Sequence, residues 1–540
     1  MTIEIYDTTL RDGAQALGVS ITQENHIALC KELDEFGVDY IELGWPVNMA
    51  NNTELIDIFK ICKPLVKRAK IVAFGSTTTA KNPADDKKIS SLIDSGADYT
   101  CIFGKTHPDN IRDELKISLE DNLNVIERSI NFLKSHNKHV FYDAEHFFDG
   151  FISNKNYALA TLLIAAKSGA ERLILCDTKG ANTPKKIKEI TELTYNFLKE
   201  KGVSAKLGVH LHGDRGLELG AALELLPYIS QVQGTMHGRG ERSGNMSLVS
   251  FIANMILEGY HFPNINPKNL KAIYESSCFA SGLEPDETAP FVGDAAFAHK
   301  GGVHQGAVGK NKSLYEHISP ETFGNQRILP LNTLGGRSSI IHVASQFGYA
   351  LKKNDPTLED KVNALFTELK FLENQGYRLD SLKAEQFLLI EKYFGQMPSL
   401  FELDLGNLEI KDGKTNGKKY SLFRCPIKIG EEIKIIEKES NNGPIDAVNK
   451  ALRETLFKKY HLSPNLNLAD YHVGIARRGR MGEESTVRTL IYFTNDIPFK
   501  TVGVSSDILE SGIIALTKAY QYHIWKELKP RNLHLRNPSF

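Results

Sequence analysis

The sequence contains no long hydrophobic run. Its longest apolar stretch, ALATLLIAA at 158–166, is far shorter than the roughly 20 residues that a membrane-spanning helix requires. The first residues show no charged region followed by an apolar block, which is the pattern of an export signal. We therefore expect no membrane partner and a cytoplasmic location.

Cysteine is also scarce, and no two cysteines form a C-x-x-C pair. This spacing is typical of reduced, buried thiols and excludes a disulfide framework or a zinc knot as the basis of the fold. It agrees with a cytoplasmic location. The six cysteines are Cys30, Cys62, Cys101, Cys176, Cys278 and Cys425.

The chain has almost no excess charge of either sign, because 65 Lys and Arg face 66 Asp and Glu. This balance argues against bulk attraction to nucleic acid or to an anionic membrane. Basic stretches such as KNPADDKK and GIARRGR are interpreted as solvated faces and loops. A hydrophobic content of 41% and a charged content of 24% are those of a globular protein, and 540 residues indicate two or three domains.

Short runs rich in β-branched and aromatic residues recur through the first part of the chain. Amphipathic stretches separate most of them, an alternation that indicates βαβ units and a parallel sheet. Eight evenly spaced repeats favour a (β/α)₈ TIM barrel over residues 1–265, whereas a doubly wound open sheet is the alternative. The predicted strands are 3–7, 39–44, 70–76, 98–104, 139–145, 172–178, 206–212 and 230–235.

Polar groups stand at the end of nearly every predicted strand. In a barrel these carboxyl ends meet at one mouth, where active sites of this fold lie. Strands with a purely structural role do not need such groups. They are Asp7, Glu42, Ser76, Lys105, Glu145, Asp177, Thr178, His210 and His212.

Two histidines end the seventh predicted strand. Residues two apart in a strand point to the same side, so His210 and His212 can face one ion. An isolated H-x-H pair is weak evidence, because paired core or surface histidines are commoner than ligands. With Asp12, which follows the first strand, the set suits a catalytic divalent ion: Mn²⁺, Mg²⁺ or Zn²⁺.

Two carboxylates at strand ends, Glu42 and Glu145, allow two interpretations. Each forms a salt bridge to a neighbouring strand, with Arg11 as one candidate partner, or each belongs to the site. Beside a metal, Arg11 is equally suited as a fixed cation for a developing oxyanion. The hydroxyl of Thr178 is able to bind a carboxylate.

The stretch GTMHGRGERSGN at 234–245 follows the last predicted strand. Its glycines indicate a tight loop, and it is not a dinucleotide-binding fingerprint. A loop at this place faces the mouth and is able to bring Glu241, Arg242 and Asn245 to it.

Together these motifs resemble one enzyme family. YDTTLRDGAQ, HLHGD, GRGERSGN, FAHKGGVHQGAV and YEHISPETFGN are similar to signatures of the Claisen-condensing DRE-TIM metallolyases, which include the 2-isopropylmalate, homocitrate and citramalate synthases. IYDTTLRDGAQALGVS, KIVAFGSTT and DAEHFFDGF resemble most the long-form (R)-citramalate synthase branch. The resemblance covers essentially the whole chain in the right order.

The resemblance implies that acetyl-CoA condenses with a 2-oxo acid, pyruvate in the citramalate case, and that the thioester is then hydrolysed, as a step of isoleucine biosynthesis. The implied metal ligands are Asp12, His210 and His212, with Asn245 as a ligand or a group supporting the ligands. The implied substrate-binding residues are Arg11, Gln15, Glu42 and Thr178. The implied catalytic residues are Arg11, Glu145, His299 and Tyr315. The last two would assist proton transfer, and nothing in their local sequence alone points to them.

The chain departs from the family pattern at three places. Gly213 stands where the family usually has Asn, and Asn110 where the long forms usually have His, although His107 is close by. His237 and Arg239 replace the more usual Asn and Tyr. These changes flank the substrate site, so we expect them to bear on the identity of the keto acid more than on the reaction class.

The second half of the chain has a different pattern. Residues 266–385 are mainly helical, and we interpret them as linker subdomains that carry His299 and Tyr315. Here the CoA contact is not marked by any basic cluster. From 386 to 540 a strand–strand–helix order occurs twice: 421–429, 431–439 and 441–460, then 470–478, 485–493 and 503–525.

This order predicts an α+β domain whose two helices begin after Gly, Asn or Ser. Such helix N-termini suit small anions, including the carboxylate of an amino acid, whereas a plain dimerisation domain is the alternative. The resemblance implies a regulatory domain that binds isoleucine or leucine, and a homodimer. The same chemistry on another 2-oxo acid, an aldolase-type lyase and a non-catalytic amino-acid sensor remain alternatives at this point.

Overall fold

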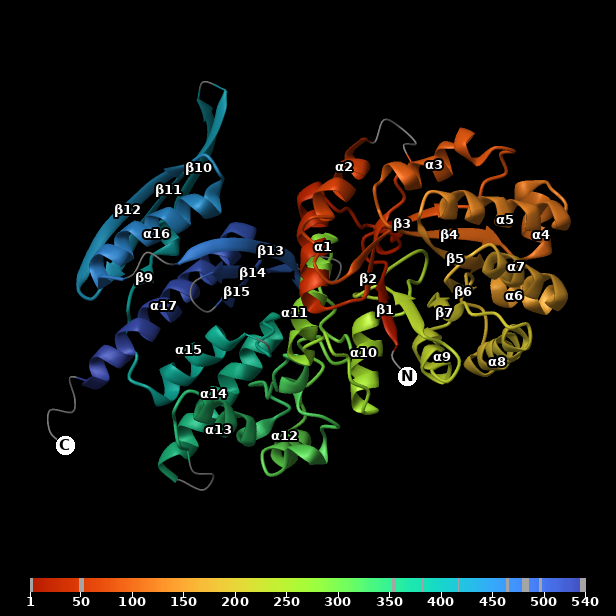
Figure 1. Ribbon diagram of the computed structural model, residues 1–540. Helices are drawn as coiled ribbons and strands as arrows, with labels where there is room; N and C mark the ends of the chain where they lie inside the picture. Colours follow the sequence, from red (N-terminus) through yellow and green to blue (C-terminus); the bar gives the residue numbers. More distant parts are fainter. Residues whose placement is uncertain are drawn as a thin grey trace. The chain divides into compact units, whose positions relative to one another are not determined.

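The computed structural model (Figure 1) describes residues 3–47, 53–351, 356–380, 382–415, 417–462, 466–477, 485–494 and 498–534. The chain forms two compact units. The first consists of Met1–Phe297 with Ser319–Gln326, and the second of Ala298–Ile318 with Arg327–Phe540. The domain boundaries expected at 265 and 385 stay predictions.

The first unit contains a closed barrel of eight parallel strands, as predicted (Figure 1). Each strand pairs with the next along the chain, and β1 also pairs with β8, which closes the barrel. The open-sheet alternative is therefore wrong. The strands are β1 (Glu4–Asp7), β2 (Tyr40–Gly44), β3 (Lys70–Ser76), β4 (Tyr99–Lys105), β5 (His139–Glu145), β6 (Arg172–Asp177), β7 (Lys206–Leu211) and β8 (Gln231–Gly234).

Helices that lie between the strands or follow the last one surround this barrel (Figure 1). They are α1 (Gln23–Phe36), α2 (Thr53–Cys62), α3 (Lys87–Asp94), α4 (Pro108–Asn110), α5 (Leu119–Ser135), α6 (Phe147–Ser153), α7 (Lys155–Lys167), α8 (Pro184–Glu200), α9 (Glu218–Glu224), α10 (Leu248–Leu257) and α11 (Leu270–Ala280). The short turns are η1 (Gly13–Gln15), η2 (Pro83–Asp85), η3 (Ile111–Leu115), η4 (Pro267–Asn269) and η6 (Pro320–Phe323).

Several of these helices begin where the sequence supplies a hydroxyl. The side chains of Thr22, Ser118 and Ser247 each accept a hydrogen bond from a backbone N–H in the first turn of α1, α5 and α10, which satisfies a donor that the helix itself leaves free. Gly37 ends α1 with a φ of 105°, and a Cβ at this position would lie 2.2 Å from the carbonyl oxygen of Asn264. Only glycine fits both conditions.

The interior of the barrel changes from its bottom to its mouth. At the amino ends of the strands, Arg172 donates to both carboxylate oxygens of Glu4, at 2.7 and 3.0 Å. Aromatic side chains fill the middle, where Tyr6, Tyr40 and Phe141 pack against one another. The barrel is therefore a packed core whose open space lies at the carboxyl ends of the strands.

The second unit begins with short and long helices. They are α12 (Gly302–Val308), η5 (Lys312–Leu314), α13 (Gly336–Gln346), α14 (Pro356–Gln375) and α15 (Lys383–Phe394). Buried apolar residues of α13, α14 and α15, among them Ile340, Leu365 and Ile390, form one core cluster. The helical character predicted for this part of the chain is confirmed.

The rest of the second unit is an α+β domain with two antiparallel sheets. In Figure 1 a helix, α16 or α17, accompanies each sheet. One sheet contains β9 (Glu402–Leu403), β10 (Glu409–Thr415), β11 (Lys418–Ile429) and β12 (Glu432–Ser440). The short turn η7 (Leu405–Asn407) connects β9 to β10, and α16 (Pro444–Tyr460) follows β12. The other sheet contains β13 (Asn467–Arg477), β14 (Thr486–Thr494) and β15 (Phe499–Ser505), followed by α17 (Ile508–His534).

The sequence predicted two strands before each helix, but both sheets contain more strands than that. Gly503 to Ser505 were assigned to the last helical run, but they end β15, and α17 begins only at Ile508. The segment FKTVGVS pairs with β14 along its whole length, from Phe499 to Ser505. Strand pairing therefore extends the sheet into residues that the sequence pattern assigned to the helix.

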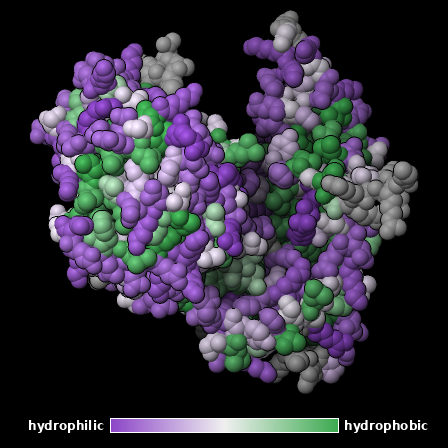
Figure 2. Space-filling view, turned by 90° about the vertical axis from the view of Figure 1, so that its right-hand side faces the viewer, coloured by the Kyte–Doolittle hydropathy of each residue, from purple (hydrophilic) through white to green (hydrophobic). Residues whose placement is uncertain are grey.

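The surface agrees with the balanced composition. On the face shown in Figure 2, hydrophilic residues predominate and hydrophobic residues form scattered groups between them. Among the residues that the structure describes, no helix is both long and apolar enough to cross a lipid bilayer.

Candidate active site at the barrel mouth

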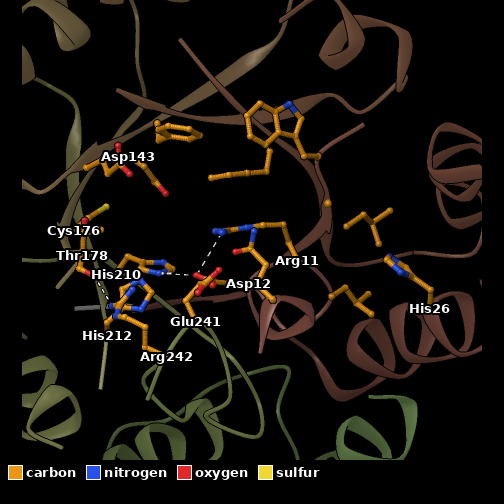
Figure 3. A pocket seen from close by; sticks show the side chains of 18 residues that line it. Arg11, Asp12, His26, Asp143, Cys176, Thr178, His210, His212, Glu241 and Arg242 are labelled. Atoms are coloured by element: carbon orange, nitrogen blue, oxygen red, sulfur yellow. Dashed lines mark hydrogen bonds and ion pairs between the residues drawn. The ribbon is translucent and has the colours of Figure 1, made fainter. Parts of the chain in front are cut away.

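A cavity of about 500 Å³ opens at the carboxyl ends of the barrel strands (Figure 3). Most of the residues predicted for the site line it, together with Glu241 and Arg242 from the loop after β8. Glu42 and Asn245 are not among the lining residues. The predicted residues in the cavity wall are Arg11, Asp12, Gln15, Glu145, Thr178, His210 and His212.

Three of these side chains form a compact group able to hold a metal ion. Candidate ligand atoms of Asp12, His210 and His212 all lie within 4.8 Å of one another, and the three residues are only 2%, 4% and 9% exposed. The strand period explains the arrangement, because His210 and His212 lie on one side of the chain at the end of β7. Figure 3 shows both imidazoles next to the Asp12 carboxylate.

The hydrogen bonding of this group is incomplete within the part of the chain that the structure describes. Asp12 Oδ1, His212 Nδ1 and both amide atoms of Asn245 are buried without a hydrogen-bond partner. Asn245 lies beside His212, because the two residues form an isolated antiparallel bridge. Buried polar atoms are normally paired. Two imidazoles, a carboxylate and an amide with free atoms fit a divalent cation.

The charges of the group depend on its neighbours. Burial opposes ionisation of Asp12, but Arg11 and His210 outweigh it and hold the pKa of Asp12 well below its usual range. Burial, together with the adjacent His210, lowers the pKa of His212 to about 3. A carboxylate and a neutral imidazole are the forms that bind metal ions.

A relay behind His210 fixes the direction of its ring. His210 Nδ1 lies 2.9 Å from Gln233 Oε1, and Gln233 Nε2 donates to Asp143 Oδ1 at 3.4 Å. Because the amide oxygen only accepts, Nδ1 donates to Gln233, while Nε2 faces Asp12 Oδ2, 3.1 Å away. Burial opposes protonation of His210, but the Asp12 carboxylate outweighs it and raises the pKa of His210. Supporting bonds of this kind orient metal-binding histidines in proteins.

Arg11 is held on three sides. Its Nε lies 2.5 Å from Glu42 Oε2, its Nη1 lies 3.4 Å from Asp12 Oδ2, and its guanidinium carbon lies 3.8 Å from the centre of the Phe74 ring. Tyr6 donates its hydroxyl to the other oxygen of Glu42 at 2.7 Å. Glu42 is therefore the salt-bridge partner of Arg11, behind the cavity wall.

Glu145 both lies in the site and forms a salt bridge, the two alternatives that the sequence left open. It lines the cavity, and its Oε2 lies 2.7 Å from Lys105 Nζ at the end of the neighbouring strand. The Thr178 hydroxyl accepts the backbone N–H of His146 at 2.8 Å, which leaves its own proton free to be donated into the cavity. Arg242 donates to the carbonyl oxygen of Thr178 at 2.7 Å.

His299 and Tyr315 belong to the second unit. Their ring centres lie 6.4 Å apart, and the Tyr315 ring lies 4.1 Å from that of His304. His299 Nε2 lies 3.2 Å from Glu316 Oε1, and Glu316 also forms an ion pair with Arg327. The two residues are neighbours, and their part in proton transfer stays a prediction.

Three family models match successive parts of the chain. Residues 2–276 match the model described as HMGL-like, which covers the barrel. Residues 291–376 match the homocitrate synthase post-HMGL domain-like model, and residues 383–524 match the LeuA allosteric (dimerisation) domain.

Curated relatives match nearly the whole chain. The (R)-citramalate synthase of Aquifex aeolicus is 38% identical over 97% of this chain and 98% of the relative. That of Sulfolobus acidocaldarius is 35% identical over 97% of both chains, and that of Geobacter sulfurreducens is 36% identical over 97% and 98%. The chain belongs to the (R)-citramalate synthase family.

The departures from the family pattern have definite places in the structure. A Cβ at Gly213 would lie 3.3 Å from the carboxyl carbon of Glu218. Asn110 donates to Glu114, and His107 Nδ1 accepts the backbone N–H of Asp109 at the start of α4. None of these residues is part of the cavity wall.

His237 is buried in the loop after β8. Its Nδ1 accepts the backbone N–H of Arg239, and its Nε2 lies 3.1 Å from Ser281 Oγ. Burial, followed by the charge of Arg239, lowers the pKa of His237 to about 4. The residue therefore acts as a neutral bridge between this loop and the end of α11, outside the cavity wall of this citramalate synthase family member.

Sequence reasoning missed several residues of the site. Asp143 lies two residues before Glu145 and Gln233 one residue before the end of β8, and both point into the barrel, which the period of two would have indicated. Trp45 and Phe103 line the cavity and pack edge-on, 5.8 Å apart. Lys105 appeared in the sequence only as a strand end, and nothing there signalled its two carboxylate partners.

Proposed function

We propose that the protein is a (R)-citramalate synthase that condenses acetyl-CoA with pyruvate and hydrolyses the thioester to give (R)-citramalate and CoA. Full-length similarity to five curated (R)-citramalate synthases, 32–38% identical over at least 95% of the chain, carries this proposal. The buried Asp12, His210 and His212 group supports it, because the family chemistry requires a Lewis acid.

In this reaction the acetyl methyl group loses a proton, its carbon bonds to the carbonyl carbon of pyruvate, and the former carbonyl oxygen gains a proton. Water then cleaves the carbon–sulfur bond and releases CoA. A divalent ion, Mn²⁺, Mg²⁺ or Zn²⁺, held by Asp12, His210 and His212 with Asn245 as a ligand or support, would polarise the carbonyl group. The incomplete hydrogen bonding of these side chains supports this assignment.

The remaining residues bind and orient the keto acid. Arg11 offers a fixed cation next to Asp12, and Glu42 and Phe74 keep its plane in place, so it stabilises charge that develops on the keto oxygen without having to move. Thr178 donates its free hydroxyl proton to the carboxylate, and Gln15 at the cavity rim adds a polar contact.

Glu145 faces the reacting carbons, with Lys105 as its ion-pair partner. His299 and Tyr315 complete the proton transfers from the linker, as the family resemblance implies. Their neighbouring rings support a shared role.

A second candidate is the same chemistry on 2-oxoisovalerate. The 2-isopropylmalate synthase of Methanocaldococcus jannaschii is 29% identical over 95% of this chain. Pyruvate is favoured because Trp45, Phe74 and Phe103 line the cavity close to Arg11, which suits a methyl group better than an isopropyl group.

The test measures CoA release from acetyl-CoA with pyruvate, 2-oxobutyrate, 2-oxoisovalerate or 2-oxoglutarate, each with Mg²⁺, Mn²⁺ or Zn²⁺ and with a chelator. We expect chelator-sensitive release that is fastest with pyruvate. Fastest release with another keto acid would reassign the substrate, and none at all would favour a lyase or a sensor. His210→Gln should abolish turnover, whereas His139→Gln at the opposite end of the barrel should not.

The match to the LeuA allosteric domain over residues 383–524 supports a regulatory role for the second unit. We expect isoleucine or leucine to inhibit, two copies to form a homodimer, and the enzyme to work in the cytoplasm in isoleucine biosynthesis. If either amino acid at millimolar concentration leaves both the rate and the melting midpoint unchanged, that amino acid is not an effector.

A further inference from the structure

Lys105 and Glu145 form an ion pair at the ends of two adjacent barrel strands. The parallel register of β4 and β5 places the two residues opposite each other, and Lys105 Nζ lies 2.7 Å from Glu145 Oε2. Glu145 lines the cavity, whereas Lys105 is not among the lining residues and its side chain is only 13% exposed. The lysine therefore holds the carboxylate from behind.

The same ammonium group has a second carboxylate partner. Glu114 Oε2 lies 2.6 Å from Lys105 Nζ. Glu114 belongs to η3, a single π-helical turn, and Asn110 at the end of α4 donates its amide N–H to the other carboxylate oxygen. Asn110, which departs from the family pattern, is thus connected to the cavity through Glu114, Lys105 and Glu145.

The backbone at the base of Lys105 is fixed. Its carbonyl oxygen accepts a hydrogen bond from Asn122 Nδ2 at 2.9 Å, and the same amide donates to Tyr157 at 2.8 Å. The next residue, Thr106, donates its backbone N–H to the carbonyl oxygen of Glu145 at 3.1 Å. Because both strand ends are anchored, the ammonium group reaches both carboxylates without rearrangement.

We propose that Lys105 is a positioning residue for Glu145 and that Glu114, oriented by Asn110, shares its ammonium group and so sets how firmly Glu145 is held in its ionised form. The proposal rests on the proposed function, in which Glu145 works as a carboxylate. It extends that function by assigning a role to three residues outside the cavity wall.

Substituting Lys105 and substituting Glu114 should move the acid limb of the pH profile in opposite directions. Without Lys105, Glu145 and Glu114 are two like charges with no cation between them, so the acid limb of the pH profile moves to higher pH. Without the charge of Glu114, Lys105 acts on Glu145 alone, and the limb moves to lower pH. A residue that merely stabilises the fold would not produce opposite shifts.

The other titratable groups that act on Glu145 stay the same in these variants. His146 follows it in the chain, Tyr142 lies on the same strand, and Cys176 lies on β6 across the cavity. Asp143, on the same strand, points toward Gln233. None of these groups hydrogen-bonds to Lys105 or Glu114, so Glu114→Gln removes one ion pair and Lys105→Met removes two, those with Glu145 and Glu114.

The experiment compares the pH profiles of kcat/KM for CoA release in the wild type, Lys105→Met, Lys105→Arg and Glu114→Gln, all with the keto acid that the wild type uses fastest. Lys167→Met and Glu127→Gln, two exposed positions on α7 and α5, are the matched controls. We expect Lys105→Met to lower kcat about tenfold or more, to change KM for the keto acid far less, and to raise the acid limb by about one pH unit.

Lys105→Arg should recover much of the lost kcat, and Glu114→Gln should lower the acid limb. Shifts in the same direction, or no shift in either variant, would overturn the proposal. Because the fastest keto acid is used throughout, a preference for one other than pyruvate contradicts the proposed substrate without affecting this comparison.

A second readout requires no turnover. In folded Lys105→Met the carboxylates of Glu145 and Glu114 lose the cation between them, so the melting midpoint relative to the wild type should fall further as the pH rises from about 4 to 7. A constant difference over this range would show that Lys105 does not hold Glu145. If the wild type releases no CoA at all, the proposed function fails, and this measurement still decides the pairing.

Discussion

Two buried polar clusters in this chain are built in opposite ways. The mouth cluster, Asp12, His210, His212 and Asn245, leaves several buried atoms without a hydrogen-bond partner among the residues that the structure describes. The Glu391 cluster of the second unit is complete: the Glu391 carboxylate, which is fully buried, accepts from Tyr349 at 2.9 Å, Trp525 at 2.7 Å and Lys529 at 2.6 Å.

The difference distinguishes a binding site from a polar cluster that stabilises the fold. Leaving a buried polar atom unpaired costs about 1–3 kcal/mol, so a cluster that leaves several of them unpaired is strained unless something binds there. The Glu391 cluster needs no ligand, and it ties α15 to α17 and to the residues after α13. The mouth cluster is accordingly expected to serve binding, and the Glu391 cluster to serve stability.

The largest expected effect concerns the mouth cluster. His212→Gln should lower turnover by about 10³-fold, because several kcal/mol of charge stabilisation would depend on the metal ion that we propose His212 helps to hold. The melting midpoint of the metal-free protein should hardly change, since His212 Nδ1 has no hydrogen-bond partner to lose among the described residues.

Steady-state kinetics and calorimetry on chelator-treated protein check both parts of this prediction. His136→Gln, at an exposed histidine after α5, is the matched control. A variant that unfolds far more easily but keeps its turnover would reverse the distinction between the two clusters.

Much of the barrel and its mouth followed from the sequence for a physical reason. Strand and helix periods are local, and the carboxyl ends of parallel strands converge, so polar strand ends such as Asp12, His210 and Glu145 had to meet. Asp12, His210 and His212 lie together, as this reasoning expects, and their role as metal ligands stays a prediction.

Other features depend on partners that are distant in the sequence. Glu42 follows the same rule as Glu145, yet Arg11 and Tyr6 occupy both of its oxygens. Local pattern does not show which partner a charged strand end will find. The shared ammonium of Lys105 and the edge strand β15 were missed for the same reason, since both depend on pairing across the fold.

The Glu391 cluster should show the next largest effect, on stability. Glu391→Ala leaves the buried donors of Trp525 and Tyr349 without an acceptor, and we expect the unfolding free energy of the second unit to fall by about 3 kcal/mol. Urea unfolding followed by Trp525 fluorescence, in a Trp45→Phe background because the chain has 2 tryptophans, measures this change.

Glu368→Ala is the matched control, since Glu368 also binds a lysine, Lys392 at 2.8 Å, and the Tyr393 hydroxyl, but is 23% exposed. It should cost less than about 1 kcal/mol. Equal losses in the two variants would mean that burial does not distinguish these ion pairs. Metal affinity at the mouth should be unchanged in both.

A fall in pH should weaken the hydrogen bonding of His237, because a protonated Nδ1 no longer accepts the backbone N–H of Arg239. Unfolded histidine titrates near pH 6.5 and folded His237 near 4, so as the pH falls below about 6.5 the unfolded chain binds the proton first and stability declines until about pH 4. The loss amounts to at most about 3.5 kcal/mol, since each pKa unit corresponds to about 1.4 kcal/mol.

Buried His26, whose pKa is also lowered to about 4 by burial, should contribute a similar decline. His212, whose pKa is lowered to about 3, contributes over the same range. His237→Asn should therefore remove about a third of the change in melting midpoint that these three histidines cause between pH 6.5 and 4. An unchanged slope in this variant would show that His237 is already able to bind a proton in the folded protein.

The smallest expected effect concerns the support of the mouth cluster. Gln233→Met removes the acceptor for His210 Nδ1–H, so the imidazole is free to rotate or to take the other tautomer. Metal affinity, measured by calorimetric titration, should weaken by about 10–100-fold, less than the loss of a ligand.

Gln231→Met is the control for this last comparison, because Gln231 lies two residues earlier on the same strand and side but bonds to Glu4 at the other end of the barrel. Both variants lose a buried amide from the barrel interior, so both should be destabilised to a similar extent. Only Gln233→Met should weaken metal binding. Equal metal affinity in the two variants would mean that His210 is oriented by the strand alone, and that the mouth cluster needs no support from within the barrel.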